Sequence, residues 1–341
     1  MVALSGPITV GVDVGGTKIL GVALDDIGQV VTELRTSTPT PTGVDRADET
    51  AAVAAIANLV DRVIDDWASA VPPRGRVLLG VGLPGLVDLA GTLHFAPHLP
   101  WAMTTDIMTD LRQRLPHCEI VVDNDANCSA LAESTYGSAV GAACALVITV
   151  GTGIGGGLVI DGRPFRGANG LAGEMGHMVI DPTGPQCPCG RRGCWELYAS
   201  GSALGRLARR AADAGELSGA LADSGIPKDT LSGRHVTEAA LNGDVQALGM
   251  LAEVAGWLAL GLANLVAIMD PSVIVVGGGL IAAGELLLGP LRSKLGDITS
   301  SAGRPPTQVQ AATMDERSGA VGAAINARSL LGAKGASEGQ R

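Results

Sequence analysis

Apolar runs at the start of the chain predict strands that are joined by a glycine turn. Residues 8–14 (ITVGVDV) and 19–25 (ILGVALD) read as two strands on either side of the turn GGTK, and a third strand follows near 29–34. Apolar residues then recur at helical spacing over 45–68, and 76–83 reads as a buried strand that leads into LPGLVD. This order of strands and a long helix is typical of a layered α/β domain.

The same opening pattern returns in the second half of the chain. A helix predicted over 125–136 leads to ALVITVGTGIGGGLVID at 145–161, which again reads as strand, glycine turn and strand. Laying Asp13 on Thr149 superposes VGGT on VGTG at a spacing of 136 residues, far longer than the roughly 20 to 50 residues of a solenoid repeat. The repetition predicts a duplicated α/β domain with a cleft between its halves.

This organisation predicts two lobes. We place a small α/β lobe at residues 1–123, which a C-terminal helix at about 316–331 would complete, and a large α/β lobe at 124–315. The end of the chain, 332–341, is predicted to be a disordered tail.

Composition and charge favour a cytoplasmic enzyme. Hydrophobic residues make up 46% of the chain but aromatic residues only 2%, so the cores are expected to consist of Ala, Val, Leu and Ile. The net charge of −10 and the lack of a basic cluster argue against nucleic-acid binding. No signal peptide is recognised, and the longest apolar stretch, 254–269, is shorter than the roughly 20 residues that span a bilayer. We therefore expect no membrane contact and read that stretch as a buried helix.

Three strands end in glycine turns that are suited to phosphate. These are Gly15-Gly16-Thr17-Lys18, the run 151–157 and the run 277–279. Glycine lets backbone N–H groups close on an oxyanion, although each turn alone could be a simple hairpin. A strand rather than a helix follows the first two turns, so neither a P-loop nor a dinucleotide fingerprint fits. The remaining option, a strand–turn–strand phosphate cradle in each half, resembles the actin and sugar-kinase type of ATPase fold.

A group of polar residues stands where a strand ends and a helix begins. In VVDNDANCSALAE (121–133), two Asp and two Asn fall within 123–127, at the carboxyl end of a strand, where α/β proteins place ligands. A single Asp at this position would be read as an N-cap, but one cap does not need four such residues. A carboxylate here could accept the proton of a hydroxyl nucleophile while the neighbouring Asn side chains hold sugar hydroxyls.

Cysteines cluster in CPCGRRGCWE (187–196), and His177 stands ten residues before the first of them. Cys187, Cys189, Cys194 and His177 form a complete tetrahedral ligand set for structural zinc, with glycines between them that let the chain wrap. A redox thiol pair and unliganded core cysteines are the alternatives. Glu174 and Glu196 flank this zinc knuckle and are either solvated acids or acceptors for polyol hydroxyls. Cys118, Cys128 and Cys144 stand apart in apolar surroundings and are read as core residues.

Together these motifs resemble the ROK sugar kinases, and most closely the bacterial ATP-dependent glucokinases of that family. The resemblance covers about residues 8–330 and rests on DVGGTK (13–18), LPGLVD (83–88), NDANCSALAE (124–133), GTGIGGGLVIDG (151–162), GEMGH (173–177), CPCGRRGCWE (187–196) and VVGGGL (275–280). It implies a two-lobed actin/hexokinase-like, ribonuclease H-like fold with an interlobe cleft.

The resemblance also implies a role for individual residues. Asp125 would be the general base that activates the 6-hydroxyl of the sugar. His177 would contact the sugar with one ring nitrogen and bind zinc with the other. The remaining implied sugar contacts are Gly85, Asn124, Asp125, Glu174 and Glu196. The implied contacts to ATP and Mg²⁺ are Asp13, Gly15, Gly16, Thr17, Lys18, Gly151, Thr152, Gly153, Gly277, Gly278 and Gly279.

The function implied is the ATP-dependent phosphorylation of glucose to glucose 6-phosphate, by a dimer or tetramer of this chain. Relatives with the same core motifs phosphorylate N-acetylmannosamine, N-acetylglucosamine, mannose or fructose, so another hexose is the alternative substrate. At His98 many relatives carry Asn, which leaves a sugar contact there open. A sugar-sensing ROK repressor is the alternative from another class, but it would need a DNA-binding helix-turn-helix ahead of Ile8, where only seven residues stand.

Overall fold

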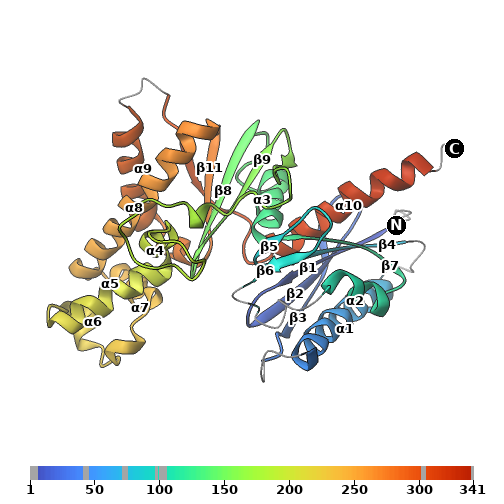
Figure 1. Cartoon of the computed structure of the whole chain (residues 1–341), viewed down its shortest axis with the longest axis horizontal. Helices are drawn as coiled ribbons and strands as arrows, with labels where there is room; N and C mark the ends of the chain where they lie inside the picture. The colour runs from blue at the N-terminus through green and yellow to red at the C-terminus, as the bar shows by residue number, and fades with distance from the viewer. Residues whose placement is uncertain are drawn as a thin grey trace. The chain divides into compact units, whose positions relative to one another are not determined.

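The strands of the computed structural model form two five-stranded sheets of the same design, and the chain divides into two compact units (Figure 1). The structure describes residues 7–40, 46–70, 76–96, 99, 106–300 and 305–338. Unit 1 comprises Met1–Tyr136, Arg163–Ala172 and Met314–Arg341, and unit 2 comprises Gly137–Gly162 and Gly173–Thr313. The chain therefore passes between the units four times.

The sheet of unit 1 has the strand order β3-β2-β1-β4-β7. Its hairpin strands β1 and β2 are antiparallel, and β4 and β7 continue parallel to β1. The strands are β1 (Ile8–Val14), β2 (Lys18–Leu24), β3 (Val30–Ser37), β4 (Val77–Leu83) and β7 (Cys118–Asn124), with a separate short pair β5 (Leu86–Val87) and β6 (Leu93–Phe95).

Helices cover both faces of this sheet because side chains alternate along its strands. Val10 and Val12 of β1 join a core with α1 (Arg46–Ala70) and α2 (Ile107–Arg114), while the opposite face packs on α3 (Asp125–Tyr136) and α10 (Ser318–Glu338). A Cβ on Gly11 would lie 1.9 Å from the carbonyl oxygen of Ala320, and one on Gly80 would lie 1.8 Å from that of Ala323. The backbone of α10 therefore touches the sheet through glycines, which no other residue could replace.

The second sheet has the strand order β10-β9-β8-β11-β12, and all of its strands except β10 belong to unit 2. The hairpin of β8 and β9 is antiparallel, and β11 and β12 continue parallel to β8, as β4 and β7 do to β1. The strands are β8 (Cys144–Val150), β9 (Ile154–Ile160), β10 (Arg163–Pro164), β11 (Val273–Gly277) and β12 (Gln308–Ala311). The predicted duplication is confirmed, since β8 begins 136 residues after β1.

One hydrophobic core joins this sheet to the helices of unit 2. Of the described helices only α8 is long and apolar enough to cross a membrane, but 56% of its most apolar stretch is buried inside the protein. This agrees with the buried helix predicted there. The helices are α4 (Glu196–Ala199), α5 (Gly201–Ala214), α6 (Gly219–Asp223), α7 (Gly233–Leu241), α8 (Val245–Met269) and α9 (Glu285–Thr299), with 3-10 helices η2 (Met175–His177), η3 (Lys228–Thr230) and η4 (Gly279–Ala283).

The division into units differs from the predicted lobes in three places. Residues 124–136 belong to unit 1 rather than to the large lobe, because α3 packs along α10. Residues 163–172 also belong to unit 1, although unit 2 flanks them on both sides. Helix α10 continues to Glu338, so 332–338 of the predicted tail is helical, and 339–341 lies outside the described residues.

Candidate functional site

The predicted site residues divide between the two units, and those of unit 1 meet where β7 runs into α3. Asn124 accepts a hydrogen bond on Oδ1 from the Asn127 N–H (3.0 Å), so Asn124 rather than Asp125 caps the helix. Its Nδ2 donates to the carbonyl of Gly85 (3.0 Å). Asp125 then begins α3, where its Oδ1 accepts from the N–H of Ala126 (2.8 Å). The start of α3 is therefore capped by the Asn124 side chain and not by the Asp125 carboxylate.

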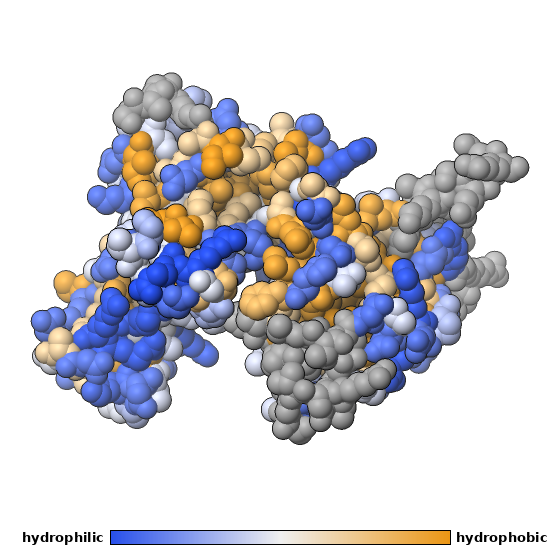
Figure 2. Space-filling view, in the orientation of Figure 1, coloured by the Kyte–Doolittle hydropathy of each residue, from blue (hydrophilic) through white to orange (hydrophobic). Residues whose placement is uncertain are grey.

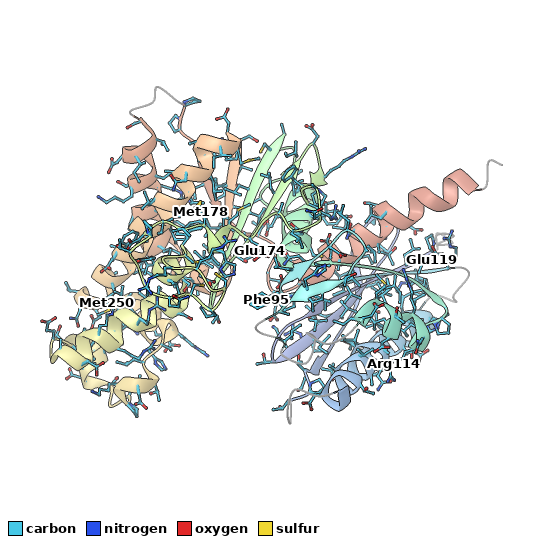
Figure 3. The ribbon with its side chains drawn as sticks, in the orientation of Figure 1. Phe95, Arg114, Glu119, Glu174, Met178 and Met250 are labelled. Carbon is cyan, nitrogen blue, oxygen red and sulfur yellow. The ribbon has the colours of Figure 1, made fainter. Side chains whose placement is uncertain are left out.

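Gly85 is required by its surroundings as well as by its backbone conformation. Its φ is +116°, and a Cβ there would lie 2.1 Å from the carbonyl oxygen of Phe95, which is labelled in Figure 3. The carbonyl of Gly85 is thereby held against Asn124. The LPGLVD motif and the Asn-Asp pair therefore meet within unit 1.

The first glycine turn lies between β1 and β2 and is fixed by backbone hydrogen bonds. The N–H of Gly15 donates to the carbonyl of Lys18 (2.9 Å), and Thr38 donates from its hydroxyl to Gly15 (2.7 Å) and from its N–H to Thr17 (3.0 Å). The turn is therefore preformed. The Lys18 ammonium is half exposed and pairs with Glu316.

Asp13, at the end of β1, is electrostatically coupled to Asp125. A Cβ on Gly82 would lie 3.7 Å from Oδ1 of Asp13 and 3.5 Å from Cα of Asp125, so both residues lie beside this glycine. Burial raises the pKa of Asp13 to about 7, with the charge of Asp125 as the second cause and Lys18 acting in the opposite direction. Two carboxylates in this position favour a bound cation or a shared proton.

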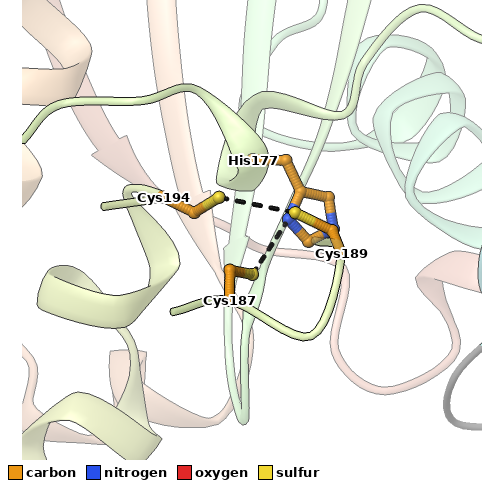
Figure 4. Close-up of side chains that lie close together, drawn as sticks. All are labelled: His177, Cys187, Cys189 and Cys194. Atoms are coloured by element: carbon orange, nitrogen blue, oxygen red, sulfur yellow. Dashed lines mark hydrogen bonds between the residues drawn. The ribbon is translucent and has the colours of Figure 1, made fainter. Parts of the chain in front are cut away.

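In unit 2, the four predicted zinc ligands come together (Figure 4). Their ligand atoms all lie within 4.8 Å of one another. The Sγ atoms of Cys189 and Cys194 are 3.6 Å apart, and Sγ of Cys187 is 3.7 Å from Nδ1 of His177. Ligands about 2.3 Å from a tetrahedral zinc would be separated by about 3.8 Å, so the set fits the ion.

The chemistry of the cysteines also favours a cation in this space. Cys187 and Cys194 are fully buried, and burial raises the pKa of Cys187 to about 12. A thiolate at Cys187 would need a compensating positive charge, which a metal ion supplies. The turn that carries the ligands needs Gly193, whose φ is +69° and whose Cβ would lie 1.5 Å from the carbonyl oxygen of Asp181.

Glu174 and Glu196 lie on opposite sides of the His177 ring. Oε1 of Glu196 is 3.4 Å from Nδ1 of His177, and Oε2 of Glu174 is 3.9 Å from Nε2. Glu174 and Met178, both labelled in Figure 3, flank the short helix η2 that carries the histidine. Both carboxylates therefore lie beside the predicted zinc ligand His177.

Glu196 also contacts the second glycine turn. A Cβ on Gly153 would lie 2.4 Å from Oε2 of Glu196, so the carboxylate occupies the space that a side chain would need. The preceding residue, Trp195, is fully buried and donates from Nε1 to the carbonyl of Trp257 in α8 (2.8 Å). The Trp195 ring packs on α8 at Gly261, where the lack of a side chain makes room for it; a Cβ there would lie 2.1 Å from the ring. Glu196 therefore follows a firmly anchored residue.

A pocket of about 680 Å³ opens beside this turn, entirely within unit 2. Its walls are the turn itself, the first two turns of α5, the residues from Ser232 along α7, and η4. The surface over α5 to α7 is largely hydrophilic (Figure 2). Helices α5 and α7 approach each other closely at Gly201 and Gly233, since a Cβ on Gly233 would lie 2.3 Å from the carbonyl oxygen of Gly201. The pocket is large enough for a nucleoside.

The structure brings some of the predicted glycines to this pocket and others elsewhere. Gly151, Thr152 and Gly279 line it, whereas Gly153 packs on Glu196. Gly278 has φ +84°, and its Cβ would lie 2.6 Å from the backbone of Val150, so packing between β8 and the end of β11 explains it. Its neighbour Gly277 does not line the pocket either. His98, for which the sequence left a sugar contact undecided, lies outside the described residues.

Sequence reasoning missed the walls that α5 and α7 supply. They include Ser202, Gly205, Arg209, Ser232, Gly233 and Thr237. The glycines at 201, 205 and 233 within helical patterns were the available signal, since glycine inside a helix usually marks a close approach. Sequence reasoning also missed Arg166, which donates from Nη2 to Asp123 at 2.6 Å.

Comparison with known proteins connects this geometry to one family. The ROK family model matches residues 9–329. The glucokinase of Streptomyces coelicolor is 38% identical over 332 residues, which cover 94% of this chain and 98% of that protein. The xylose repressor of Bacillus subtilis is 28% identical over 293 residues, covering 84% of this chain and 68% of the repressor.

A solved structure confirms the fold class. The ROK family glucokinase from Streptomyces griseus, in complex with glucose and AMPPNP, matches with a TM-score of 0.78 and 34% identity, over 94% of this chain and 99% of that one. The predicted two-lobed actin/hexokinase-like α/β fold with a duplicated hairpin domain is therefore confirmed.

Proposed function

Because this chain belongs to the ROK family, we propose that it is an ATP-dependent glucokinase, which transfers the γ-phosphoryl group of ATP to the 6-hydroxyl of glucose. The likeness to two streptomycete glucokinases over nearly their whole length supports this substrate. The observation that carries the chemistry is the Asp125 carboxylate, which begins α3 beside Asp13 while Asn124 caps the helix.

Asp125 is the general base of the proposed reaction. It accepts the proton of the 6-hydroxyl as the sugar oxygen forms a bond to the γ-phosphorus, and the bond between that phosphorus and ADP breaks. Gly85 and Asn124, which are hydrogen-bonded to each other, orient the sugar on this side. Asp13 is suited to the neighbourhood of Mg²⁺, because its raised pKa reflects a buried carboxylate next to another negative charge. When bound, Mg²⁺ neutralises the phosphate oxygens during transfer.

The nucleotide is assigned to the two glycine turns and the pocket. The N–H groups of Gly15 and Gly151 already donate within their own turns, to Lys18 (2.9 Å) and Gly153 (3.0 Å). The backbone N–H groups of Gly16 and Thr17 in unit 1 and of Thr152 in unit 2 would therefore be the ones that donate to phosphate oxygens. Lys18 adds a positive charge near the first turn. The pocket between α5, α7 and η4 would take the nucleoside.

Zinc is assigned a structural role in sugar recognition. His177, Cys187, Cys189 and Cys194 would occupy all four positions of the ion and leave none for water, so zinc would not take part in phosphoryl transfer. Its binding would fix Glu174, Glu196 and Nε2 of His177 as hydrogen-bonding partners for the sugar hydroxyls.

We place the enzyme in the cytoplasm, as a homo-oligomer without membrane or nucleic-acid partners, consistent with its net charge of −10. Another hexose as substrate and a sugar-sensing regulator are the competing functions. The xylose repressor among its relatives is the observation that supports the regulator.

A sugar panel distinguishes these functions. Wild type and Asp125→Asn are assayed with MgATP and glucose, mannose, N-acetylglucosamine, N-acetylmannosamine or fructose, with Asp66→Asn on the exposed face of α1 as the matched control. We expect the highest kcat/KM with glucose, a loss of at least about 10²-fold in Asp125→Asn and full activity in the control. Full activity in Asp125→Asn would refute the role of that residue, and no turnover of any sugar would favour the regulator.

A further inference from the structure

A buried polar network lies directly behind the junction of β7 and α3. Its centre is Asp123, whose Oδ2 accepts from Nε (2.9 Å) and Nη2 (2.6 Å) of Arg166 and from Nδ2 of Asn326 (3.0 Å). Arg166 also donates from Nη2 to Oδ1 of Asn326 (2.9 Å). Three segments far apart in sequence therefore converge on one carboxylate within unit 1.

The other oxygen of Asp123 reaches the residues that begin α3. Oδ1 accepts from the backbone N–H of Asn124 (2.9 Å) and from Nδ2 of Asn127 (3.3 Å). Asn124 in turn caps α3 and binds the carbonyl of Gly85. A continuous chain of hydrogen bonds thus runs from the Arg166 guanidinium to the residue that immediately precedes Asp125.

The charges in this region make the arginine necessary. Burial raises the pKa of the Cys128 thiol, and the charges of Asp123, Asp13 and Asp125 raise it further while that of Arg166 lowers it. The Asp123 side chain is only 7% exposed and that of Arg166 20%, so removal of the arginine would leave a buried carboxylate without its counter-ion. Such a group would turn away or draw in water, and the Asn124 N–H would lose its acceptor.

The segment that carries Arg166 has a second, independent anchor. Gly170 has φ +89°, and a Cβ there would lie 2.6 to 2.8 Å from the backbone of Asp88 and Leu89. Residues 163–172 are therefore held against unit 1 by packing as well as by the ion pair. Loss of the Arg166 side chain is expected to leave the segment in place.

We propose that Arg166 is a positioning residue: through Asp123 it sets the backbone of the β7–α3 junction and thereby the direction of the Asp125 carboxylate. The effect on catalysis rests on the proposed function, in which Asp125 is the general base. The effect on the junction itself does not, because it concerns hydrogen bonds that exist without substrate. A misplacement of about 1 Å at a reacting group can cost up to about 10²-fold in rate.

The test compares Arg166→Met, Arg166→Lys, Asp123→Asn and the double variant Arg166→Met/Asp123→Asn, with the exposed Arg163→Met as the control from the same segment. We expect Arg166→Met to lower kcat with glucose by about 10- to 100-fold while both KM values change less than about threefold. Arg166→Lys should restore part of the rate. The double variant should exceed Arg166→Met, because the neutral Asn keeps an acceptor for the Asn124 N–H without a stranded charge. A kcat within twofold of wild type in Arg166→Met, or no gain in the double variant, would overturn the catalytic part.

Hydrogen exchange gives a readout that does not depend on activity. In Arg166→Met, amides 124–127 should exchange faster than in wild type, while those of β1 should not change. If acceleration is confined to residues 163–172, Arg166 only pins its own segment and the proposal is wrong. The sugar assay of wild type and Asp125→Asn tests the proposed function separately. If wild type had no kinase activity, the proposed function would fail, but the hydrogen-exchange prediction would still stand.

Discussion

Substitution of one glycine in α8 tests whether Trp195 is the anchor of the knuckle. Gly261 faces the Trp195 indole, and a Cβ there would lie 2.1 to 2.5 Å from three of its ring atoms. Real contacts are not that short, so Gly261→Ala must displace a side chain that is fully buried and hydrogen-bonded to the carbonyl of Trp257. Gly256, in the same helix, has no atom within 4 Å of its missing Cβ and supplies the matched control.

Helix propensity and core packing change the free energy of unfolding in opposite directions. Replacing glycine by alanine within a helix stabilises it by up to about 1 kcal/mol, and this gain is shared by both variants. Overpacking in a core costs about 1–3 kcal/mol, and the clash with an immobile ring places Gly261→Ala at the upper end. The expected net change is a loss of about 2 kcal/mol for Gly261→Ala and a gain of up to about 1 kcal/mol for Gly256→Ala. For a domain of this size a loss of about 2 kcal/mol lowers the thermal midpoint by about 4–8 °C.

Calorimetry and sugar kinetics together decide the outcome. The midpoint of the unit 2 transition should fall in Gly261→Ala and rise slightly in Gly256→Ala. Because Glu196 follows Trp195, Gly261→Ala should also raise the KM for glucose, while the KM for ATP should change less. If Gly261→Ala is as stable as Gly256→Ala, the indole can move aside at no cost, and the anchoring role assigned to Trp195 is wrong.

Three further predictions concern the carboxylates and the metal site. Asp13→Asn should be more stable than wild type at pH 8 in Mg²⁺-free buffer. The pKa of Asp13 is about 7 in the native state, so wild type loses stability between about pH 4 and 7, where the unfolded chain has given up a proton that the native state retains. Urea unfolding at pH 5 and pH 8 checks this, and a variant less stable than wild type at pH 8 would contradict it. Gly153→Ala should raise the KM for glucose by displacing the carboxylate packed against it, whereas Gly151→Ala, with open space around its missing Cβ, should leave that KM near the wild-type value. The purified protein should carry about one zinc per chain, and Cys189→Ser should lose both the metal and glucose affinity while Cys118→Ser keeps both; glucose affinity in a zinc-free protein would refute the organising role of the metal.

The features that sequence predicted well are those fixed by neighbouring residues. The two hairpins follow from alternating strands around Gly15 and Gly151, and the zinc ligand set follows from four residues within 18 positions, 177–194. The start of α3 at Asp125 also follows from local polar residues, although the cap proves to be Asn124. In each case the chain brings the partners together over a few turns of backbone.

The features that sequence did not predict depend on contacts between distant segments. The lobe boundary was placed at 123 because a strand ends there, but packing on α10, almost 200 residues later, assigns α3 to unit 1. Arg166 lies in a loop without regular spacing, and nothing near it in sequence announces Asp123 or Asn326 as partners. The pocket beside the second glycine turn is likewise lined by α5, α7 and η4, and the close contacts of their glycines form only when the helices pack together.

The close docking of α10 on the sheet has a consequence for the order in which the protein forms during synthesis. Strands β1 and β4 present Gly11 and Gly80 to a helix that the ribosome makes much later. Helix α3 approaches the same helix so closely that a Cβ on Gly322 would lie 1.7 Å from the carbonyl oxygen of Cys128. Unit 2 has all of its segments once Thr313 has been translated, but unit 1 must wait for residues 318–338. Strand β1 therefore remains without α10 while the whole of unit 2 is made, and during that time its apolar face is exposed to aggregation.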